Sequence, residues 1–159
     1  MDYLWSPWRY QYVSKSAPPL GCIFCVASSE HRDKEHLIVH RGEHNFVILN
    51  RYPYSTGHLM IAPYEHIATL EAASQPAVHE MMQLAREAEI HLREVYRPQG
   101  LNLGMNLGES AGAGVPGHIH MHVLPRWVGD TNFMTTVGET RVLPETLEVT
   151  YEKLRWNRL

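Results

Sequence analysis

The chain lacks several features that would assign it to a specialised class of protein. It has only two cysteines, Cys22 and Cys25, in 159 residues, which is too few for a fold held together by disulfides. It has no apolar run approaching the roughly 18 residues of a membrane-spanning helix. Its first residues, MDYLWSPWRYQYV, lack the apolar core of a signal peptide. We therefore expect a cytoplasmic protein with no membrane partner.

An excess of positive charge is also missing. Lys and Arg together number 14 and Asp and Glu 17, for a net charge of −3 with neutral histidine. This balance provides no broad basic field for nucleic acid, so we expect no nucleic-acid partner, and any anionic ligand must be held by a local site. No internal repeat is visible, and the length fits one domain over 1–159.

Hydrophobic periodicity predicts an α+β fold with an antiparallel sheet, one long helix and a C-terminal tail. We expect an N-terminal arm over 1–20, a core over 21–127 and the tail over 128–159. The predicted strands cover 46–50, 58–62 and 101–105, and a further strand contains a run of alternating histidines. A short amphipathic segment, 147–156, closes the tail.

The clearest predicted helix covers residues 75–96. Ser74 is the expected N-cap, and Arg97-Pro98-Gln99-Gly100 ends the helix. The apolar residues recur at helical spacing: Val78, Met81, Met82, Ala85, Ala88, Leu92, Val95 and Tyr96. His79 and His91 lie off this stripe, and we expect both in solvent without a role.

The stretch GHIHMHVLPRW, 117–127, places three histidines at every second position. Because side chains of a β-strand alternate between faces, His118, His120 and His122 should share one face, with Ile119 and Met121 on the other. A half-buried strand with a polar face would explain one histidine. Three in register favour a functional site, since imidazole titrates near neutral pH, binds metals and acts as a nucleophile.

A glycine-rich loop, 108–117, leads directly into the histidines. Such a loop can turn its backbone N–H groups toward phosphate oxygens, although it can equally be a flexible connector. Next to a histidine nucleophile, it suggests a substrate that carries a phosphoryl group.

Cys22-Ile-Phe-Cys25 has the spacing of a metal-binding pair. Two further ligands are needed, and spacing alone nominates any of the 11 histidines. A pair of small buried thiols is about as consistent with the spacing. Asn50 and His58, at the facing ends of two predicted strands, are unremarkable by themselves.

Taken together, these blocks resemble the histidine triad (HIT) family. The segment His118-Ile-His120-Met-His122-Val-Leu124 resembles the family signature, in which three histidines alternate with apolar residues. GHLMIAPYEH, CIFC and LNLGMNLGESAG resemble further family blocks in the same order, so that the resemblance covers most of 21–127. The flanks LWSPWR and PRWVGDTNFMTTVGETRVLPE are similar to a bacterial branch that includes diadenosine tetraphosphate phosphorylases.

The resemblance implies a HIT-like fold and an enzyme that transfers a nucleotidyl group. The middle triad histidine of the family is the nucleophile, which falls on His120, and it forms a nucleotidyl-histidine at the α-phosphorus. His122 and His58 match family histidines near the phosphate and complete the implied catalytic set. The implied substrate-binding residues are Asn50, which matches the ribose position, with Asn106, Gly112, Ala113, Gly114 and His122.

The resemblance also implies a structural zinc ion and a partner. In zinc-containing relatives the ligands match Cys22, Cys25, His66 and His118. HIT relatives are generally homodimers, with the long helix and an edge strand near the interface, so we expect a homodimer that binds a small nucleotide substrate.

One departure from the family bears on the reaction. Many members carry Gly-Gln-Ser/Thr before the triad, where this chain has Ala113-Gly114-Val115. The missing polar side chains argue against simple hydrolysis and are compatible with a phosphorylase. We therefore expect nucleotidyl transfer on a dinucleoside polyphosphate such as diadenosine tetraphosphate, with phosphate or water as the acceptor. The alternatives are a nucleoside phosphoramidase or adenylate hydrolase, and a nucleotide-binding protein with slow turnover.

Overall fold

The computed structural model describes residues 21–131, 135 and 143–156. Our expectations for the arm 1–20 and for most of the tail between 132 and 142 lie outside these described residues.

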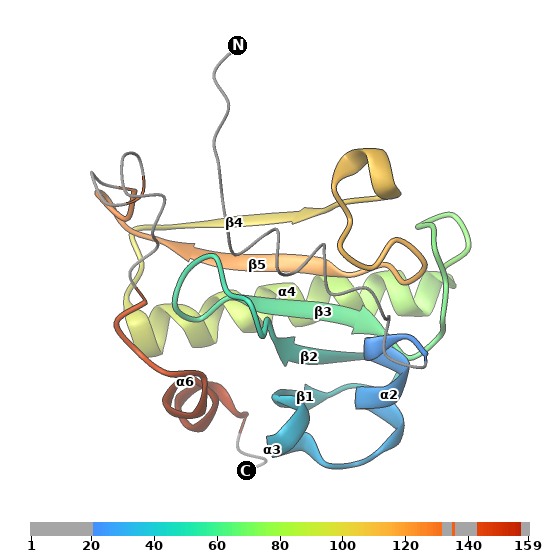
Figure 1. Cartoon of the computed structure of the whole chain (residues 1–159), viewed down its shortest axis with the longest axis horizontal. Coiled ribbons are helices and arrows are strands. Elements are labelled where there is room, and N and C mark those ends of the chain that lie inside the picture. The colour runs from blue at the N-terminus through green and yellow to red at the C-terminus, as the bar shows by residue number, and fades with distance from the viewer. Residues whose placement is uncertain (1–20, 132–134, 136–142, 157–159) are drawn as a thin grey trace.

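Five strands form one antiparallel sheet in the order β1-β2-β3-β5-β4, with β1 and β4 at the edges (Figure 1). The strands are β1 (Ile38–Arg41), β2 (Asn45–Leu49), β3 (Leu59–Pro63), β4 (Gly100–Met105) and β5 (Met121–Arg126). The predicted α+β class with an antiparallel sheet is confirmed. Strand β1 was not predicted, because four residues are too short for a periodic signal.

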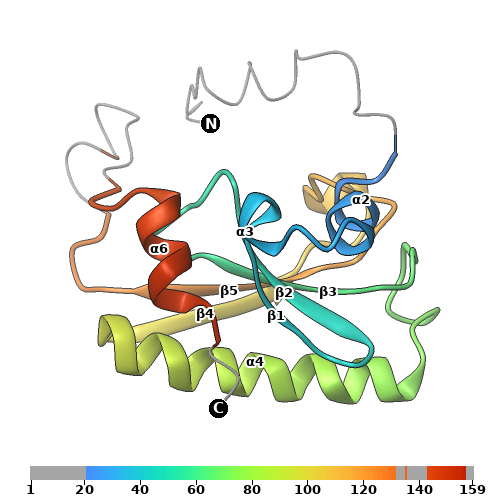
Figure 2. The same ribbon diagram turned by 90° about the horizontal axis from the view of Figure 1, so that it is seen from below.

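The helices cover both faces of the sheet. Helix α4 (Gln75–Tyr96) lies under one face, which we call the helix face, and α2 (Ile23–Ser29) lies over the opposite face, which we call the histidine face (Figure 2). The short α3 (Asp33–His36), the 3₁₀ helix η1 (Glu109–Ala111) and α6 (Leu147–Leu154) complete the described elements. Within the described ranges, no helix is long and apolar enough to cross a membrane.

Each face of the sheet has its own apolar cluster. On the helix face, strand residues such as Val47, Ile61 and Val123 pack against α4 and against Tyr151 and Leu154 of α6. The cluster on the histidine face consists of Phe24, Ala27, Ile38, Phe46, Ile48, Met60 and Ala62. Alternate residues of β2 therefore serve opposite faces, as the period of a strand requires.

Helix α4 has the bounds that the sequence predicts. Ser74 accepts a hydrogen bond from the Ala77 N–H, and Arg97 ends the helix with a φ of 48°. The predicted apolar stripe was wrong at Met82, which is 55% exposed, while Ala77 and Leu84 are buried in its place. The stripe thus turns by part of a helical turn relative to the prediction.

His91 was wrongly expected in solvent. Its ring makes an edge-on contact with Trp156, with 6.2 Å between the ring centroids, and its Nε2 is buried. The cause is the C-terminal segment, whose Trp156 N–H donates to the Val39 carbonyl and so brings the indole next to α4. His79, in contrast, is exposed as expected.

The histidine strand begins later than predicted. Strand β5 starts at Met121, opposite Ile61 of β3, because the Ile119 N–H donates to the carbonyl of Ile67 in the loop after β3 and not to a strand. The alternation itself is confirmed. Met121 and Val123 belong to the helix face, and His122 lies opposite Met60 on the histidine face.

Gly57 sets the start of β3. Its φ is +80°, and a Cβ at this position would lie 3.2–3.3 Å from atoms of Leu92, Tyr96 and Pro125. Glycine is therefore required both for the backbone conformation and for the close approach of the chain. This turn delivers the next residue, His58, to the histidine face.

Candidate active site

The three alternating histidines divide between two neighbouring clusters. His118 is fully buried and turns toward α2 and the loop after β3. His120 is 4% exposed and stands between His118 and His122 along the chain. His122 meets His58 of the adjacent strand region. The segment 118–122 thus contributes to two parts of one site, a cluster around His118 and a pair formed by His122 and His58.

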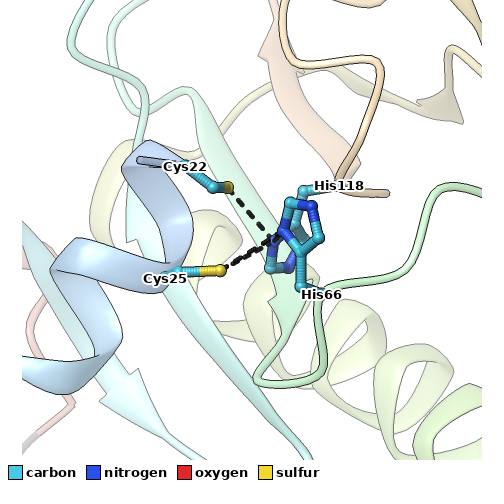
Figure 3. A group of neighbouring side chains, drawn as sticks. All are labelled: Cys22, Cys25, His66 and His118. Atoms are coloured by element: carbon cyan, nitrogen blue, oxygen red, sulfur yellow. Dashed lines mark hydrogen bonds between the residues drawn. The ribbon is translucent and has the colours of Figure 1, made fainter. Parts of the chain in front are cut away.

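Cys22, Cys25, His66 and His118 converge at one end of α2 (Figure 3). The Cys22 sulfur lies 3.3 Å from Nδ1 of His118, and the Cys25 sulfur lies 3.3 Å from Nδ1 of His66. The two Nδ1 atoms are 3.3 Å apart, and the four ligand atoms all lie within 4.8 Å of one another. The cysteines and His118 are 96 and 93 residues apart in the chain, so only the fold brings them together.

The hydrogen bonding of His118 prepares it as a ligand. Its Nε2 lies 2.8 Å from the Pro63 carbonyl, which can only accept, so the imidazole proton is on Nε2 and the lone pair is on Nδ1. That lone pair points toward the two thiols and His66 (Figure 3). A carbonyl that fixes the tautomer of a ligating histidine is the usual arrangement at metal sites.

The separations suit a tetrahedral metal ion. Bond lengths of about 2.0–2.1 Å to nitrogen and about 2.3 Å to sulfur place tetrahedral ligands about 3.3–3.7 Å apart, and the contacts here span 3.3–3.6 Å. Burial and the neighbouring Cys22 thiol raise the pKa of the Cys25 thiol, and a bound cation would reverse this by favouring the thiolate. The cluster could therefore hold a metal ion.

His120 is held with one nitrogen engaged and the other available. Its Nδ1 lies 2.9 Å from the His118 carbonyl, so Nδ1 carries the proton and Nε2 carries the lone pair. Burial lowers the pKa of His120, and the hydrogen bond to the carbonyl opposes this only in part. The imidazole is therefore neutral near pH 7, which is the nucleophilic form.

His58 and His122 form a hydrogen-bonded pair. The Tyr54 N–H donates to Nδ1 of His58 at 3.2 Å, so the His58 proton is on Nε2, which donates to Nδ1 of His122 at 2.8 Å. It follows that neutral His122 carries its proton on Nε2 and presents an N–H donor. Burial, with a smaller contribution from the charge of His120, lowers the pKa of His122 to about 4.

Asn50 lies at the end of β2, beside this pair. Its Oδ1 accepts the Tyr52 N–H at 2.9 Å, which is the turn-forming role that asparagine often has. Asn50 and His58 also line a small pocket together with Thr56, Glu145 and Thr150. The residue predicted for ribose thus has a structural role in the turn, and it lines a small pocket together with His58.

The glycine loop is partly closed on itself. The Gly112 N–H donates to the Glu109 carbonyl at 2.9 Å, and the Ala113 N–H donates to the Gly108 carbonyl at 3.3 Å. Gly112 adopts a φ of +84°, where glycine is favoured. Asn106 is half-buried directly after β4. Two of the predicted phosphate-binding amides therefore serve the loop itself.

Two residues of the site were absent from the sequence-based prediction. The Phe24 ring contacts the rings of both His118 and His120, and the Tyr54 ring stacks near His122 at 6.1 Å and 26°. The only signal for Phe24 was its place inside the CIFC pair, and nothing in the sequence marked Tyr54.

Comparison with known proteins identifies the family. The family model described as HIT domain matches residues 31–128, and the chain belongs to this family, the histidine triad proteins.

A relative from Mycobacterium tuberculosis named AP-4-A phosphorylase is 37% identical over 169 aligned positions, which cover 99% of this chain and 86% of the relative. Two solved structures share the fold. A zinc-bound histidine triad family protein from Mycobacterium smegmatis has a TM-score of 0.68 at 28% identity and covers 85% of this chain and 91% of its own. A hypothetical histidine triad nucleotide-binding protein from Sulfolobus tokodaii has a TM-score of 0.68 at 28% identity. The match covers 84% of this chain and 89% of that protein. The expected family and fold are thereby confirmed.

Proposed function

We propose that this protein transfers a nucleotidyl group from a dinucleoside polyphosphate, such as diadenosine tetraphosphate, to inorganic phosphate. The observation that carries the proposal is the proton arrangement of the histidines. His120 holds a lone pair on Nε2, and the adjacent His122 presents an N–H on Nε2. A nucleophile beside a donor is what displacement at a phosphate requires. The similarity to the AP-4-A phosphorylase of Mycobacterium tuberculosis supports the same substrate class.

The reaction would proceed in two displacements at the α-phosphorus. Nε2 of His120 attacks, a P–N bond forms, and the bond to the bridging oxygen breaks with its electron pair leaving on ATP. His122, supported by His58, donates a hydrogen bond to a phosphate oxygen and stabilises the charge that develops there. An oxygen of inorganic phosphate then attacks the same phosphorus, the P–N bond breaks, its electrons return to Nε2, and ADP leaves.

The loop before the triad supports phosphate over water as the acceptor. Water must be positioned by a polar side chain, and Ala113-Gly114-Val115 provides none. Because Gly112 and Ala113 use their N–H groups within the loop, we attribute the loop's contribution to small side chains that leave room for phosphate. Asn50 and Asn106 remain our proposed contacts to the nucleoside part of the substrate.

A product assay tests this function directly. Diadenosine tetraphosphate is incubated with the protein at rising phosphate concentrations, and the nucleotides are separated by chromatography. We expect ADP and ATP to form faster as phosphate rises into the millimolar range. Gly114→Gln should shift the products toward AMP and ATP, while Gly100→Gln, at a glycine with open space around it, should not. AMP and ATP at every phosphate concentration would make the protein a hydrolase.

We also propose that the ion held by Cys22, Cys25, His66 and His118 is a structural zinc. Two sulfur and two nitrogen ligands are a donor set that zinc favours, and four protein ligands leave no position for substrate. The zinc-bound relative from Mycobacterium smegmatis supports this choice. Thiols that bind a metal must stay reduced, which fits our expectation of a cytoplasmic protein.

A further inference from the structure

We propose that Phe24 is a positioning residue that couples the metal cluster to the nucleophile His120. The inference rests on the proposed function of His120 and adds a residue to which neither the family resemblance nor the relatives' names assign a role. Phe24 lies on α2 between the two cysteines of the cluster and is 1% exposed.

The contacts of Phe24 join the two parts of the site. Its ring centroid lies 4.9 Å from that of His120, with 39° between the ring planes, and 5.2 Å from that of His118. One buried ring therefore contacts both a proposed metal ligand and the proposed nucleophile. Phe24 also packs in the apolar cluster of the histidine face. Packing in that cluster would not by itself require contacts with two histidines.

His120 needs this contact because, among the described residues, its ring makes one hydrogen bond, which leaves the ring under-restrained. The bond from Nδ1 to the His118 carbonyl fixes one atom, and the imidazole can still pivot about it. The ring centroids of Phe24 and His122 lie 4.9 Å and 5.0 Å from that of His120. The two rings therefore flank the imidazole and restrict its rotation. In-line attack requires the Nε2 lone pair to point at phosphorus, and a small misplacement of a reacting group costs rate steeply.

The metal cluster would affect the position of Phe24 because α2, the helix that carries Phe24, is unstable by itself. It has 7 residues, and its first cap, Cys22, makes no side-chain capping hydrogen bond. Helices of this length are unstable without tertiary contacts. Ligation through Cys22 and Cys25 would tether both sides of Phe24, so that loss of the ion should loosen the Phe24 ring from His120.

The experiment compares Phe24→Leu with Phe46→Leu in the full chain. Phe46 is a matched control, since it is 0% exposed and belongs to the same apolar cluster. Within the described part of the chain, its ring contacts the rings of Phe24 and Tyr64 and of no histidine. For each variant we measure zinc content, the melting temperature, nucleotide affinity, the rate of adduct formation with diadenosine tetraphosphate, and the ¹⁵N–¹H spectrum of the His120 imidazole.

We expect both variants to lower the melting temperature and to keep their zinc. Only Phe24→Leu should slow adduct formation, on the order of 10-fold or more, with nucleotide affinity unchanged. The Nδ1–H signal of His120 should exchange faster with water in Phe24→Leu and in wild type stripped of metal, and should stay as in wild type in Phe46→Leu. If Phe24→Leu does not fold, Phe24→Met replaces it.

Equal effects of the two variants on the rate and on the Nδ1–H signal would overturn the inference and leave Phe24 as core packing. If wild type forms no adduct at all, the proposed function fails. The Nδ1–H signal then decides the positioning role separately, because it needs no substrate.

Discussion

At the scale of single residues, the site depends on which ring nitrogen of each histidine carries the proton. Carbonyl acceptors place the protons of His118 and His120 on opposite nitrogens, Nε2 and Nδ1. The first residue thereby directs a lone pair at the thiols, and the second keeps its lone pair on Nε2. Backbone acceptors thus prepare two histidines of one segment differently, for the proposed roles of ligand and nucleophile.

The low pKa of His122 predicts a loss of stability in acid. The pKa of His122 is about 4 in the folded chain, against the ordinary histidine value of 6.5 in the unfolded chain. As pH falls, the unfolded chain therefore takes up the proton first. The contribution of neutral His122 to the free energy of unfolding is complete above pH 6.5. It is lost between pH 6.5 and 4, by up to about 3 kcal/mol. Denaturant unfolding of wild type and His122→Asn across this range should show the smaller loss in the variant.

His79→Asn is the control for this measurement, because it removes an exposed imidazole from α4. Parallel stability curves for wild type and His122→Asn between pH 6.5 and 4 would refute the assignment of a half-buried neutral His122.

At the scale of elements, the predictable parts are those with a long local signal. Helix α4 was predicted with its bounds, because 22 residues of amphipathic pattern and the Ser74 cap act locally. Helix α2 and strand β1 were missed, because 7 and 4 residues carry too little pattern and depend on packing. The alternation of His118, His120 and His122 indicated a shared face, whereas the Phe24 contact joins residues far apart in the chain and could not be predicted.

Metal loss should act mainly through the placement of α2. We expect about one zinc per chain in protein purified without added metal, and none in Cys22→Ser/Cys25→Ser, which should melt at a clearly lower temperature. Ser29→Ala, at an exposed position of the same helix, should match wild type in both respects. Elemental analysis with calorimetry checks this. Metal-free wild type with an unchanged melting temperature in the double variant would make the cysteines simple packing residues.

At the scale of the whole molecule, strand β4 forms an edge of the sheet that is exposed among the described residues. Strand β4 has exposed residues at its centre, and Leu103 is 45% exposed. An exposed edge strand with an apolar side chain is a site for pairing between chains. This supports the homodimer that the family resemblance implies.

Light scattering coupled to gel filtration tests the dimer. We expect the mass of two chains for wild type and of one chain for Leu103→Lys, since a buried lysine would oppose association. Leu70→Lys, at a leucine with a similar exposure of 40% in the segment between β3 and α4, should remain dimeric. A wild-type mass of one chain would contradict the proposal.

The central claim is that His120 carries the nucleotidyl group during turnover. Wild type, His120→Ala and His79→Ala are mixed with diadenosine tetraphosphate without phosphate, quenched in base because a phosphoramidate survives there, and examined by intact-mass and peptide mass spectrometry. We predict one added adenylyl group on His120 in wild type and His79→Ala, and none in His120→Ala, which should bind nucleotide but lose turnover. Turnover of His120→Ala within a few-fold of wild type, or an adduct on another residue, would contradict the account.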